Sequence, residues 1–455
     1  MPLSDIEWAS SSINRMVQDE LRYDIIEMHE EHTKLIFNLT TEQHVVYSTI
    51  ISAIDINLCG IFFVYGYGGT EKTFVWRTLS ATLRSKGDIV LNVASSGIAS
   101  LLLPGGRTAH SRFAIPLNPN EDSTCNINQG SELAELIVKC KLIIWDEAPM
   151  MHKHCFEALD RSLRDILRFN NPQGLDVPFG GKTVVFGGDF RQILPVIPKG
   201  TRQDIVHATI NASYLWRYCK VLRLTKNMRL QNSSSNNDYA QLKHFSEWIA
   251  KIGDGKIEGQ TDECEYIEIL GQILLQYSTD PIKAIVESTY PSFSSIIDDP
   301  SYLQKRAILT PTLDVVHSIN EYISSLNTSD GITYLSCDST CKSDSNVDML
   351  ADVHTPEFLN GINCSGVPNH ALTLKVGTPV MLLRNIDHSI GLCNGTRMVI
   401  TKLGNHVLEA RILSRSSAVS RVTTPEGLKI LICDSESTRK TSTANIVYNE
   451  VFQNL

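Results

Sequence analysis

The sequence predicts an α/β fold built on parallel sheets, and three stretches carry the prediction. An apolar run, rich in β-branched and aromatic residues, begins at Ile61 and passes through a glycine-rich turn into a helical pattern from Phe74 to Arg84. A second apolar run, from Leu142, ends in Asp146 and Glu147, and a third, 182–186, ends in Gly-Gly-Asp-Phe-Arg-Gln. Apolar strands that alternate with helices favour a parallel sheet with its polar strand ends at one edge.

Length and composition indicate an ordinary globular protein with more than one domain. A chain of 455 residues is long enough for two or three domains. Its 42% hydrophobic and 20% charged residues are typical of folded proteins that dissolve in water. The net charge of -9 argues against a generally basic surface for nucleic acid, but it permits a local basic groove.

Cysteine usage and the N-terminal region bear on the compartment. The eleven cysteines are scattered without metal-ligand spacing, which favours reduced thiols in a nuclear or cytosolic protein. No apolar run reaches the length of a membrane span. The first residues lack the apolar core of a signal peptide and are too acidic for a transit peptide. We therefore expect a nuclear location, with mitochondria as the alternative.

The turn after Ile61 has the pattern of a P-loop, a phosphate-binding loop between a strand and a helix. Gly66, Gly68, Gly69 and Thr70 form the turn, and Lys72 and Thr73 open the helix. Backbone N–H groups and the helix N-terminus would surround polyphosphate, with Lys72 on the outer phosphates and Thr73 on Mg²⁺. Glu71 departs from this pattern, which requires glycine before the lysine. The alternative is a surface turn without a ligand.

Polar residues at two further strand ends extend the candidate site. Asp146 can hold the Mg²⁺ shell, and Glu147 can polarise an attacking water molecule. Gln192 is a candidate sensor of the terminal phosphate, because polar groups at strand carboxyl ends face the ligand crevice of an α/β sheet. An isolated acidic pair is usually surface charge. Here the pair closes an apolar strand, which favours the functional interpretation.

Other polar residues leave two interpretations open. Gln43 can recognise an adenine edge or be a solvated helix residue. The small hydroxyl residues at 95–100 and 104–111 suit contact with a phosphate backbone, or form simple connections between strand and helix. Arg229 is a charge-neutralising finger or a surface arginine.

The rest of the chain supplies the expected framework of helices, loops and strands. Residues 1–37 and 155–168 are expected to be helical, Thr40 or Thr41 to cap a helix through Ile54, and Ser131 to cap a helix to Lys139. Residues 118–131 and 231–237 are expected loops, and 336–349 an acidic insertion. Further expected helices are 238–252, 281–287 and one from Val315. Further expected strands are 89–94, 372–384, 398–412 and 428–433, and 307–312 is expected to be a strand with its turn.

Together, the motifs resemble those of the Pif-type (petite integration frequency) helicases, which belong to superfamily one. The resemblance is strongest to the plant Helitron-transposon-like branch and extends from about residue 12 to nearly the end of the chain. It rests on the stretches GYGGTEKT, SSGIASLLLPGGRTAHSRF, LIIWDEAPM, GGDFRQILPV, LTKNMRL, AILTPT, LKVGTPVMLLRN, GLCNGTR and SRVTTPEGLKIL.

This resemblance implies two RecA-like cores with ATP between them and single-stranded DNA across their top. The implied layout is an N-terminal helical extension (1–37), a first core (38–230) with a small wedge near 101–130, a helical linker region (231–300) and a second core (301–455). By resemblance, Gln43 reads adenine. Lys72, Thr73, Asp146, Glu147 and Gln192 hold ATP and Mg²⁺, Arg229 contacts the γ-phosphate, Arg421 is a second arginine finger, and Gly97, His110 and Ser111 face DNA.

Two departures from the family pattern indicate a degenerate member. The Glu71 carboxylate could repel phosphates by up to ~4 kcal/mol per charge pair at about 4 Å, unless it turns to solvent. A left-handed backbone there would add about 1–2 kcal/mol. The second departure is the absence of the Lys-Ser-Gln-Gly motif and several dozen residues around it, with the junction near 413–418. Central strands of the second core would be missing, so we expect its sheet to be incomplete.

The expected function is 5′-to-3′ unwinding of single-stranded or forked DNA substrates, driven by ATP hydrolysis with Mg²⁺, by a monomer that acts in repair, recombination and telomere maintenance. The rival hypothesis is a catalytically impaired nucleotide- or DNA-binding relic of a transposon-derived helicase. Glu71 and the missing stretch favour the relic, whereas the retained ATP-site residues favour the enzyme. A small-substrate P-loop kinase is a third hypothesis, but it does not explain the second core.

Overall fold

A computed structural model describes the chain from Asn14 to Gln453 with several gaps. The gaps are 57–59, 170–171, 229, 231–235, 257–259, 262–263, 277, 294–298, 338–354, 363–367, 388–389, 414–423 and 434–440. The chain forms two compact units. One contains Met1–Ile267 together with Ala444–Leu455, and the other contains Glu268–Thr443.

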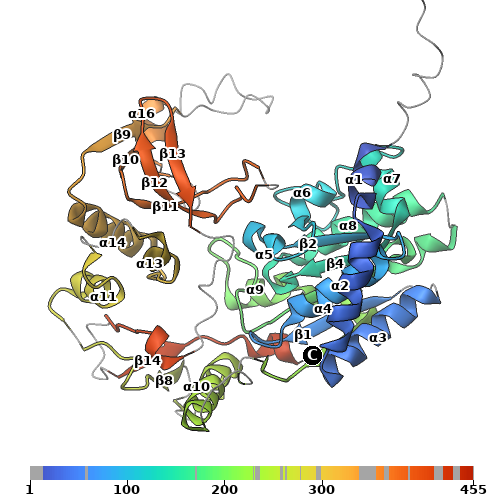
Figure 1. Ribbon diagram of the computed structural model, residues 1–455, viewed down its shortest axis with the longest axis horizontal. Helices are drawn as coiled ribbons and strands as arrows, with labels where there is room; N and C mark the ends of the chain where they lie inside the picture. Colours follow the sequence, from blue (N-terminus) through green and yellow to red (C-terminus); the bar gives the residue numbers. More distant parts are fainter. Residues whose placement is uncertain are drawn as a thin grey trace, which may run out of the picture. The chain divides into compact units, whose positions relative to one another are not determined.

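The first unit is organised around a parallel sheet of six strands in the order β3-β2-β4-β5-β1-β6 (Figure 1). This arrangement confirms the predicted α/β class and its parallel sheet. The strands are β1 (Ile61–Gly66), β2 (Ile89–Ala94), β3 (Arg107–Thr108), β4 (Cys140–Asp146), β5 (Thr183–Gly188) and β6 (Cys219–Leu224).

Helices cover both faces of this sheet, which explains why its strands are apolar throughout. Side chains of β1 alternate between the two faces: Phe63 packs in one buried cluster, whereas Phe62 and Val64 pack in the other. The described α-helices of the first unit, not all of which lie on the sheet, are α1 (Arg15–Leu21), α2 (Ile25–Phe37), α3 (Thr41–Asp55), α4 (Lys72–Arg84), α5 (Gly97–Leu101), α6 (Ala109–Phe113), α7 (Glu132–Lys139), α8 (Lys153–Leu167), α9 (Arg202–Ala208) and α10 (Asn236–Asp254). Among the described helices, none has the combined length and hydropathy that a membrane span requires.

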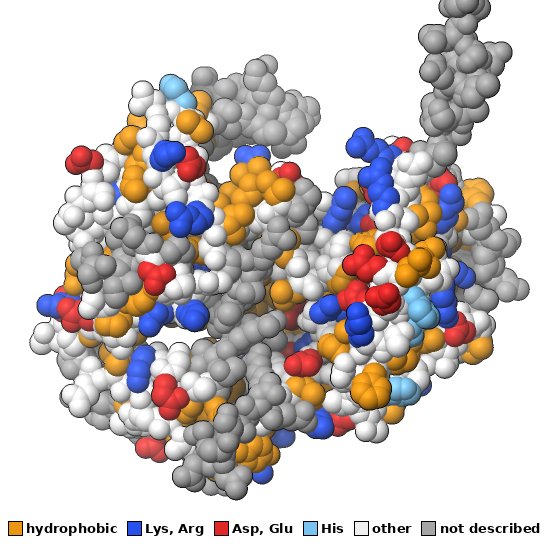
Figure 2. Space-filling view, in the orientation of Figure 1, with side chains coloured by type: hydrophobic (Ala, Val, Ile, Leu, Met, Phe, Trp, Pro, Cys, Tyr) orange, Lys and Arg blue, Asp and Glu red, His pale blue; other side chains and the backbone are white. Residues whose placement is uncertain are grey.

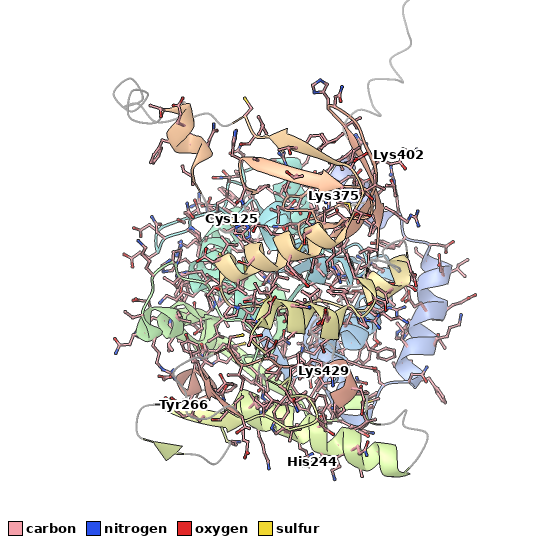
Figure 3. The ribbon with its side chains drawn as sticks, turned by 90° about the vertical axis from the view of Figure 1, so that its left-hand side faces the viewer. Cys125, His244, Tyr266, Lys375, Lys402 and Lys429 are labelled. Atoms are coloured by element: carbon pink, nitrogen blue, oxygen red, sulfur yellow. The ribbon has the colours of Figure 1, made fainter. Side chains whose placement is uncertain are left out.

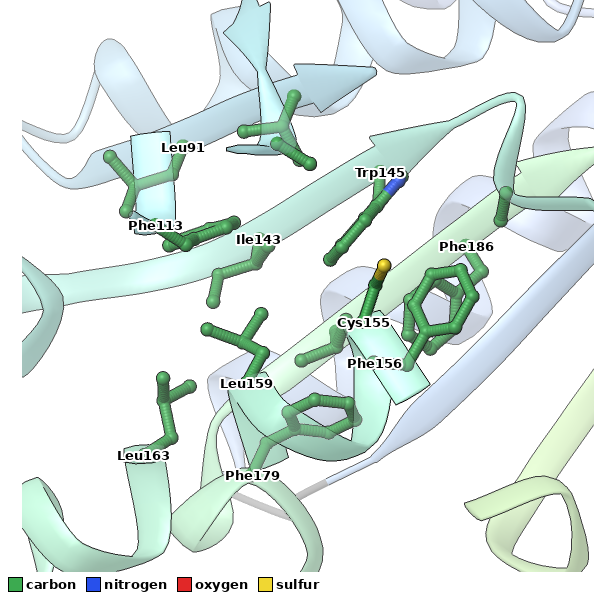
Figure 4. Packing of buried hydrophobic residues seen from close by; sticks show 14 of the residues in the cluster. Leu91, Phe113, Ile143, Trp145, Cys155, Phe156, Leu159, Leu163, Phe179 and Phe186 are labelled. Atoms are coloured by element: carbon green, nitrogen blue, oxygen red, sulfur yellow. The ribbon is translucent and has the colours of Figure 1, made fainter. Parts of the chain in front are cut away.

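The larger cluster is centred on Trp145 of β4, which is fully buried. Its ring lies 4.6 Å from that of Phe156 on α8 and 6.1 Å from that of Phe186 on β5, and Figure 4 shows the surrounding apolar side chains. Aromatic contacts of this kind fix the spacing of helix and sheet. The acidic end of β4 is therefore attached to a closely packed core.

The second unit contains small antiparallel sheets. β9 pairs with β10, and β11, β12 and β13 form a second sheet. In Figure 3, Lys375 of β10 and Lys402 of β12 are labelled; the first donates hydrogen bonds to the Ser324 and Asn327 carbonyls, and the second pairs with Glu409 at 3.1 Å. The elements are α11 (Pro281–Thr289), α13 (Pro300–Gln304), α14 (Leu313–Leu326), α16 (Pro356–Asn360), β9 (Gly331–Leu335), β10 (Ala371–Lys375), β11 (Pro379–Met381), β12 (Arg397–Leu403) and β13 (Leu408–Ile412).

A further small sheet, in the order β14-β8-β7, forms where the chain leaves and re-enters the first unit. Its strands are β7 (Gln260–Thr261), β8 (Cys264–Glu268) and β14 (Ser442–Asn445). After β14 the chain returns to the first unit, where Val451 is fully buried in the larger cluster and its carbonyl accepts a hydrogen bond from Asn211 at 2.8 Å.

Two predicted strands are wrong. Residues 307–312 form no strand, and of 428–433 only Ile430 pairs, through an isolated parallel bridge to Leu274. A strand requires a neighbour for its backbone hydrogen bonds, and the sheets β9–β10 and β11–β12–β13 of the second unit are antiparallel and do not include these residues. Leu309 accordingly is 77% exposed. The predicted acidic insertion lies outside the described residues from 338 onward, as does the junction from 414 onward.

Candidate nucleotide-binding site

Three neighbouring strands bring the predicted site residues to one edge of the first sheet. Val64 of β1 pairs with Gly187 of β5, and Trp145 of β4 pairs with Phe186 of the same strand. All three strands run parallel, so the chain leaves each of them at the same edge. The P-loop, the acidic pair and the 189–192 turn therefore begin side by side, where α/β proteins bind ligands.

The loop between β1 and α4 has the local geometry of an anion-binding turn. Thr70 folds back on the Tyr67 carbonyl through its hydroxyl (3.0 Å) and its amide (3.2 Å). Gly69 has φ of 106°, which glycine adopts readily. A Cβ at Gly66 would lie 2.5 Å from the Thr70 hydroxyl, whereas a Cβ at Gly68 would meet nothing within 4 Å. The turn is closed at its base, and α4 presents its N-terminal amides beside it.

Glu71 occupies the left-handed position that the family pattern reserves for glycine. Its backbone has φ of 57° and ψ of 45°, and it caps α4 without a side-chain hydrogen bond. This conformation costs a non-glycine residue about 1–2 kcal/mol. Because the side chain is exposed, solvent screens its carboxylate, and the conformational cost is the larger of the two expected penalties.

Lys72 is buried and points into the loop. It is 8% exposed, and its Nζ donates a hydrogen bond to the Gly66 carbonyl. The Asp189 carboxylate at the end of β5 lies within the field of this ammonium group. Burial raises the pKa of Asp189, and the Arg191 amide and the Lys72 charge partly offset that rise. Lys72 therefore places its positive charge inside the loop, where it could bind a phosphate group.

Asp146 has the features of a ligand for a hard cation. It is 4% exposed, and within the described part of the chain its Oδ1 has no hydrogen-bond partner. A buried carboxylate oxygen without a partner is costly unless a cation or water binds it. Thr73, half-buried at the second position of α4, supplies the hydroxyl that P-loops use for Mg²⁺. These residues fit Mg²⁺ bound together with polyphosphate.

The residues around Asp146 hold its strand end in place. The indole of Trp145 donates to the Ser95 hydroxyl at 3.1 Å, and the Ser95 amide donates to the Asp146 carbonyl at 3.2 Å. Glu147 follows in the left-handed region with φ of 53° and ψ of 38°. Such strain in a non-glycine residue is common at functional sites, where the surroundings fix an unusual backbone.

The structure gives Gln43 a supporting position under the P-loop. It is 2% exposed, its Nε2 donates to the Thr70 carbonyl at 3.1 Å, and its Oε1 accepts from the Thr40 amide at 3.0 Å. Thr40 and Gln43 together form a capping box at the start of α3. These bonds link α3 to the P-loop, and the recognition of adenine by Gln43 stays a prediction.

The remaining predicted residues are distributed around the same edge. Gln192 is half-buried, and its backbone amide donates a hydrogen bond to the backbone carbonyl of Asp189 at 3.1 Å. Gly97 is buried at the start of α5, whereas Ser111 on α6 is exposed. His110 is half-buried, and burial lowers its pKa. Arg229 and Arg421 lie outside the described residues.

Sequence reasoning missed three residues that the structure places at this site: Asp189, Tyr67 and Glu42. Asp189 ends a buried strand in the same way as Asp146, so the same signal could have identified it. Tyr67 donates its hydroxyl to the Thr225 carbonyl, and Arg191 lies 5.1 Å above its ring. Glu42 accepts hydrogen bonds from residues 183 and 184 positions away. Contacts so distant in sequence have no local signal.

The fold and this edge of the sheet define an α/β P-loop nucleotide-binding protein with a RecA-like core. The family model of the PIF1-like helicase matches residues 38–263, and the model of the 2B domain of DNA helicase Pif1 matches residues 357–403. Together the two models cover well over half of the chain, which belongs to the PIF1-like helicase family.

Individual relatives support this assignment. The ATP-dependent DNA helicase PIF1 of Xenopus laevis is 25% identical over 80% of this chain and 47% of its own length. The ATP-dependent DNA helicase Pif1 of a Psychrobacter species is 25% identical over 76% of this chain and 45% of its own length. The chain thus spans about half the length of these curated relatives.

Solved structures of related proteins share the fold. The crystal structure of Bacteroides Pif1 bound to ssDNA superposes with a TM-score of 0.53 at 23% identity, covering 82% of this chain and 72% of that one. The complex of the Bacteroides protein with ADP-AlF3 and ssDNA superposes with a TM-score of 0.52 at 23% identity and the same coverage. At this level of identity, the similarity establishes the fold.

Proposed function

We propose that this chain is the motor part of an ATP-dependent DNA helicase that moves 5′ to 3′ and works with reduced efficiency. One observation carries the proposal: Lys72, the unpartnered buried oxygen of Asp146, and Asp189 converge at the ends of three adjacent parallel strands. Polarity and the roles in repair, recombination and telomere maintenance rest on family resemblance. Action as a monomer in the nucleus rests on the same resemblance.

The residues at this edge can divide the work of ATP hydrolysis. Lys72 and the amides at the start of α4 would bind the outer phosphates, and Thr73 and Asp146 would hold Mg²⁺, which neutralises phosphate charge when bound. Glu147 would orient the attacking water, and Gln192 would respond to the terminal phosphate. Arg229 and Arg421 are proposed to neutralise the charge that develops on the transferred group.

Single-stranded or forked DNA is the proposed second ligand. Gly97, His110 and Ser111 follow β2 and β3, so binding along this strip would place DNA next to the edge that carries Asp146. The opposite expectation holds for α2, where Glu side chains gather on the visible face (Figure 2). Like charge would repel a phosphate backbone there. Substitutions on α2 should therefore leave DNA affinity unchanged.

The direct test is ATP hydrolysis by the purified chain with and without single-stranded DNA, beside Glu71→Gly. Lys199→Gly is a matched control, because Lys199 also has φ of 57° and is exposed, in the turn before α9. Lys72→Ala provides the background rate. Turnover by the wild type that DNA stimulates supports the helicase, and unwinding of forks with a 5′ or 3′ tail then determines polarity.

The other outcomes separate two defects. If Glu71→Gly turns over ATP while the wild type and Lys199→Gly do not, the loop residue alone limits the activity. If all three proteins are folded and none exceeds Lys72→Ala, the missing stretch near 413–418 abolishes catalysis. The chain would then be a nucleotide- or DNA-binding relic, a function that the left-handed Glu71 specifically favours.

A further inference from the structure

The segment between β6 and α10 is attached to the P-loop from two sides. We call Thr225, Lys226, Asn227 and Met228 the 225–228 segment. Its last amide, that of Met228, donates to the Gly69 carbonyl at 2.9 Å, and its first carbonyl, that of Thr225, accepts the Tyr67 hydroxyl. Gly69 and Tyr67 both belong to the P-loop. Hydrogen bonds thus hold the segment to the phosphate-binding turn at both of its ends.

Glu42, in the first turn of α3, binds the first two residues of this segment, Thr225 and Lys226. Its Oε2 accepts from the Thr225 amide at 2.7 Å and from the Lys226 amide at 3.1 Å. Its Oε1 accepts from the Thr225 hydroxyl at 2.5 Å. Three donors on one carboxylate make a strong anchor, because hydrogen bonds to a charged acceptor are about twice as strong as neutral ones.

The lowered pKa of Glu42 agrees with these hydrogen bonds to the 225–228 segment. Partial burial alone would raise the pKa of its carboxyl, but the hydrogen bonds from Thr225 and Lys226 outweigh burial and lower it. The carboxylate is therefore ionised, and accepts all three bonds, throughout the neutral range.

The neighbouring residue, Gln43, has a complementary contact. Its Nε2 donates to the Thr70 carbonyl at 3.1 Å, so it holds the P-loop itself, whereas Glu42 holds the 225–228 segment. Two consecutive residues of α3 thus fix two parts of the candidate site separately. Arg229, proposed to contact the γ-phosphate, follows Met228 directly in sequence.

We propose that Glu42 is a positioning residue, which fixes the 225–228 segment against the P-loop and, through the chain connection from Met228 to Arg229, supports recognition of the terminal phosphate. This inference rests on the proposed function. It predicts a division of labour within α3: loss of Glu42 should weaken recognition of the third phosphate, whereas loss of Gln43 should weaken the binding of any nucleotide.

The test compares ADP with a non-hydrolysable ATP analogue, both with Mg²⁺, by titration calorimetry on the full chain. The variants are Glu42→Gln and Glu42→Asp, and the control is Glu27→Gln, an exposed carboxylate on α2. All are made in the wild type and in Glu71→Gly. We expect Glu42→Gln to reduce the preference for the analogue over ADP by about 10-fold, with ADP affinity nearly constant.

Two further variants distinguish positioning from general stability. Glu42→Asp keeps the charge on a shorter side chain and should restore part of the preference. In an Arg229→Ala background, Glu42→Gln should have no further effect, because the two residues act through one segment. Thermal unfolding of each variant shows that the chain remains folded.

Equal loss of ADP and analogue binding in Glu42→Gln, or an unchanged preference, overturns the positioning role while the nucleotide site stands. Additive effects of Glu42→Gln and Arg229→Ala also overturn it. If neither the wild type nor Glu71→Gly binds either nucleotide, the proposed function is wrong, and the role of Glu42 is overturned with it.

Discussion

The two units of this chain differ in how completely their cores are formed. In the first unit, helices cover both faces of a six-stranded parallel sheet, and the described apolar side chains pack into two extensive clusters. In the second unit the described apolar cluster has five buried members: Tyr290, Phe293, Leu303, Val399 and Leu413. Among the described residues, the first unit thus has a much larger apolar core than the second.

The proposed gap in the sequence lies beside this smaller cluster. Leu413, one of its members, is the last described residue before 414–423, and no Lys-Ser-Gln-Gly occurs in the sequence. Apolar residues such as Leu309 and Val407 are 77% and 73% exposed. If strands are missing there, as we propose, distant segments cannot replace them, because strand pairing requires a continuous neighbour.

The largest expected effect is loss of the Trp145 side chain. Trp145→Ala should destabilise the first unit by about 3–5 kcal/mol, because it leaves a cavity among packed rings and removes the indole bond to Ser95. Val399→Ala, the comparison in the second unit, should cost about 1–2 kcal/mol. Hydrogen exchange followed by mass spectrometry gives the stability of each unit from its own peptides. Equal loss in both units after Trp145→Ala would contradict the expectation that the effect is confined to the first unit.

Glu20 tests whether the N-terminal helix α1 belongs to the core of the first unit. Its carboxylate contacts Arg112 and lies 3.8 Å from Arg84, and both arginines are 3% exposed. Glu20→Gln would leave this buried positive charge uncompensated and should cost about 3 kcal/mol. Asp19→Asn removes only the exposed pair with Arg22 and should change stability by less than about 0.5 kcal/mol. Chemical denaturation measures both.

A smaller effect is expected for the strained loop position. Glu71→Gly should stabilise the first unit by about 1 kcal/mol, since glycine accepts the left-handed backbone at less cost. Lys199→Gly should give a similar gain for the same reason. Only Glu71→Gly should also tighten nucleotide binding, as measured by calorimetry. A gain in affinity from Lys199→Gly as well would point to general stability and not to the phosphate loop.

The contrast between the units also explains what the sequence could predict. Strands and helices of the first unit were predictable because each apolar run has an adjacent partner and the P-loop and acidic pair mark two strand ends. Residues 307–312 also begin with an apolar run, but they form no strand, because pairing depends on residues elsewhere in the chain. The anchor from Glu42 to Thr225 spans 183 positions and has no local pattern. The local sequence pattern thus predicted helices and strands, but it did not predict which distant residues they would contact.

The smallest expected effect is on how stability depends on pH. It should distinguish Asp189 in the candidate site, whose pKa is raised, from Glu409 in the second unit, whose pKa is lowered. Burial raises the pKa of Asp189 above its ordinary value of 3.8, so the folded state binds this proton more tightly than the unfolded state. The contribution of Asp189 to the free energy of unfolding is fully present below pH 3.8, the pKa of the unfolded state. It is lost as the pH rises through the higher pKa of the folded state. Asp189→Asn should therefore stabilise the first unit at pH 7 and have no effect at low pH.

Glu409 in the second unit provides the opposite case. Hydrogen bonds from Lys402 and Thr401 lower its pKa, so its contribution is present at neutral pH and is lost on acidification. Because Glu409 is exposed, solvent screens that contribution and it should be slight. Unfolding of Asp189→Asn and Glu409→Gln, followed from pH 3.5 to 7.5, should change the pH slope in opposite directions. A slope unaffected by Asp189→Asn would contradict the raised pKa, and would mean that the Arg191 amide and the Lys72 charge offset the cost of burying this carboxylate completely.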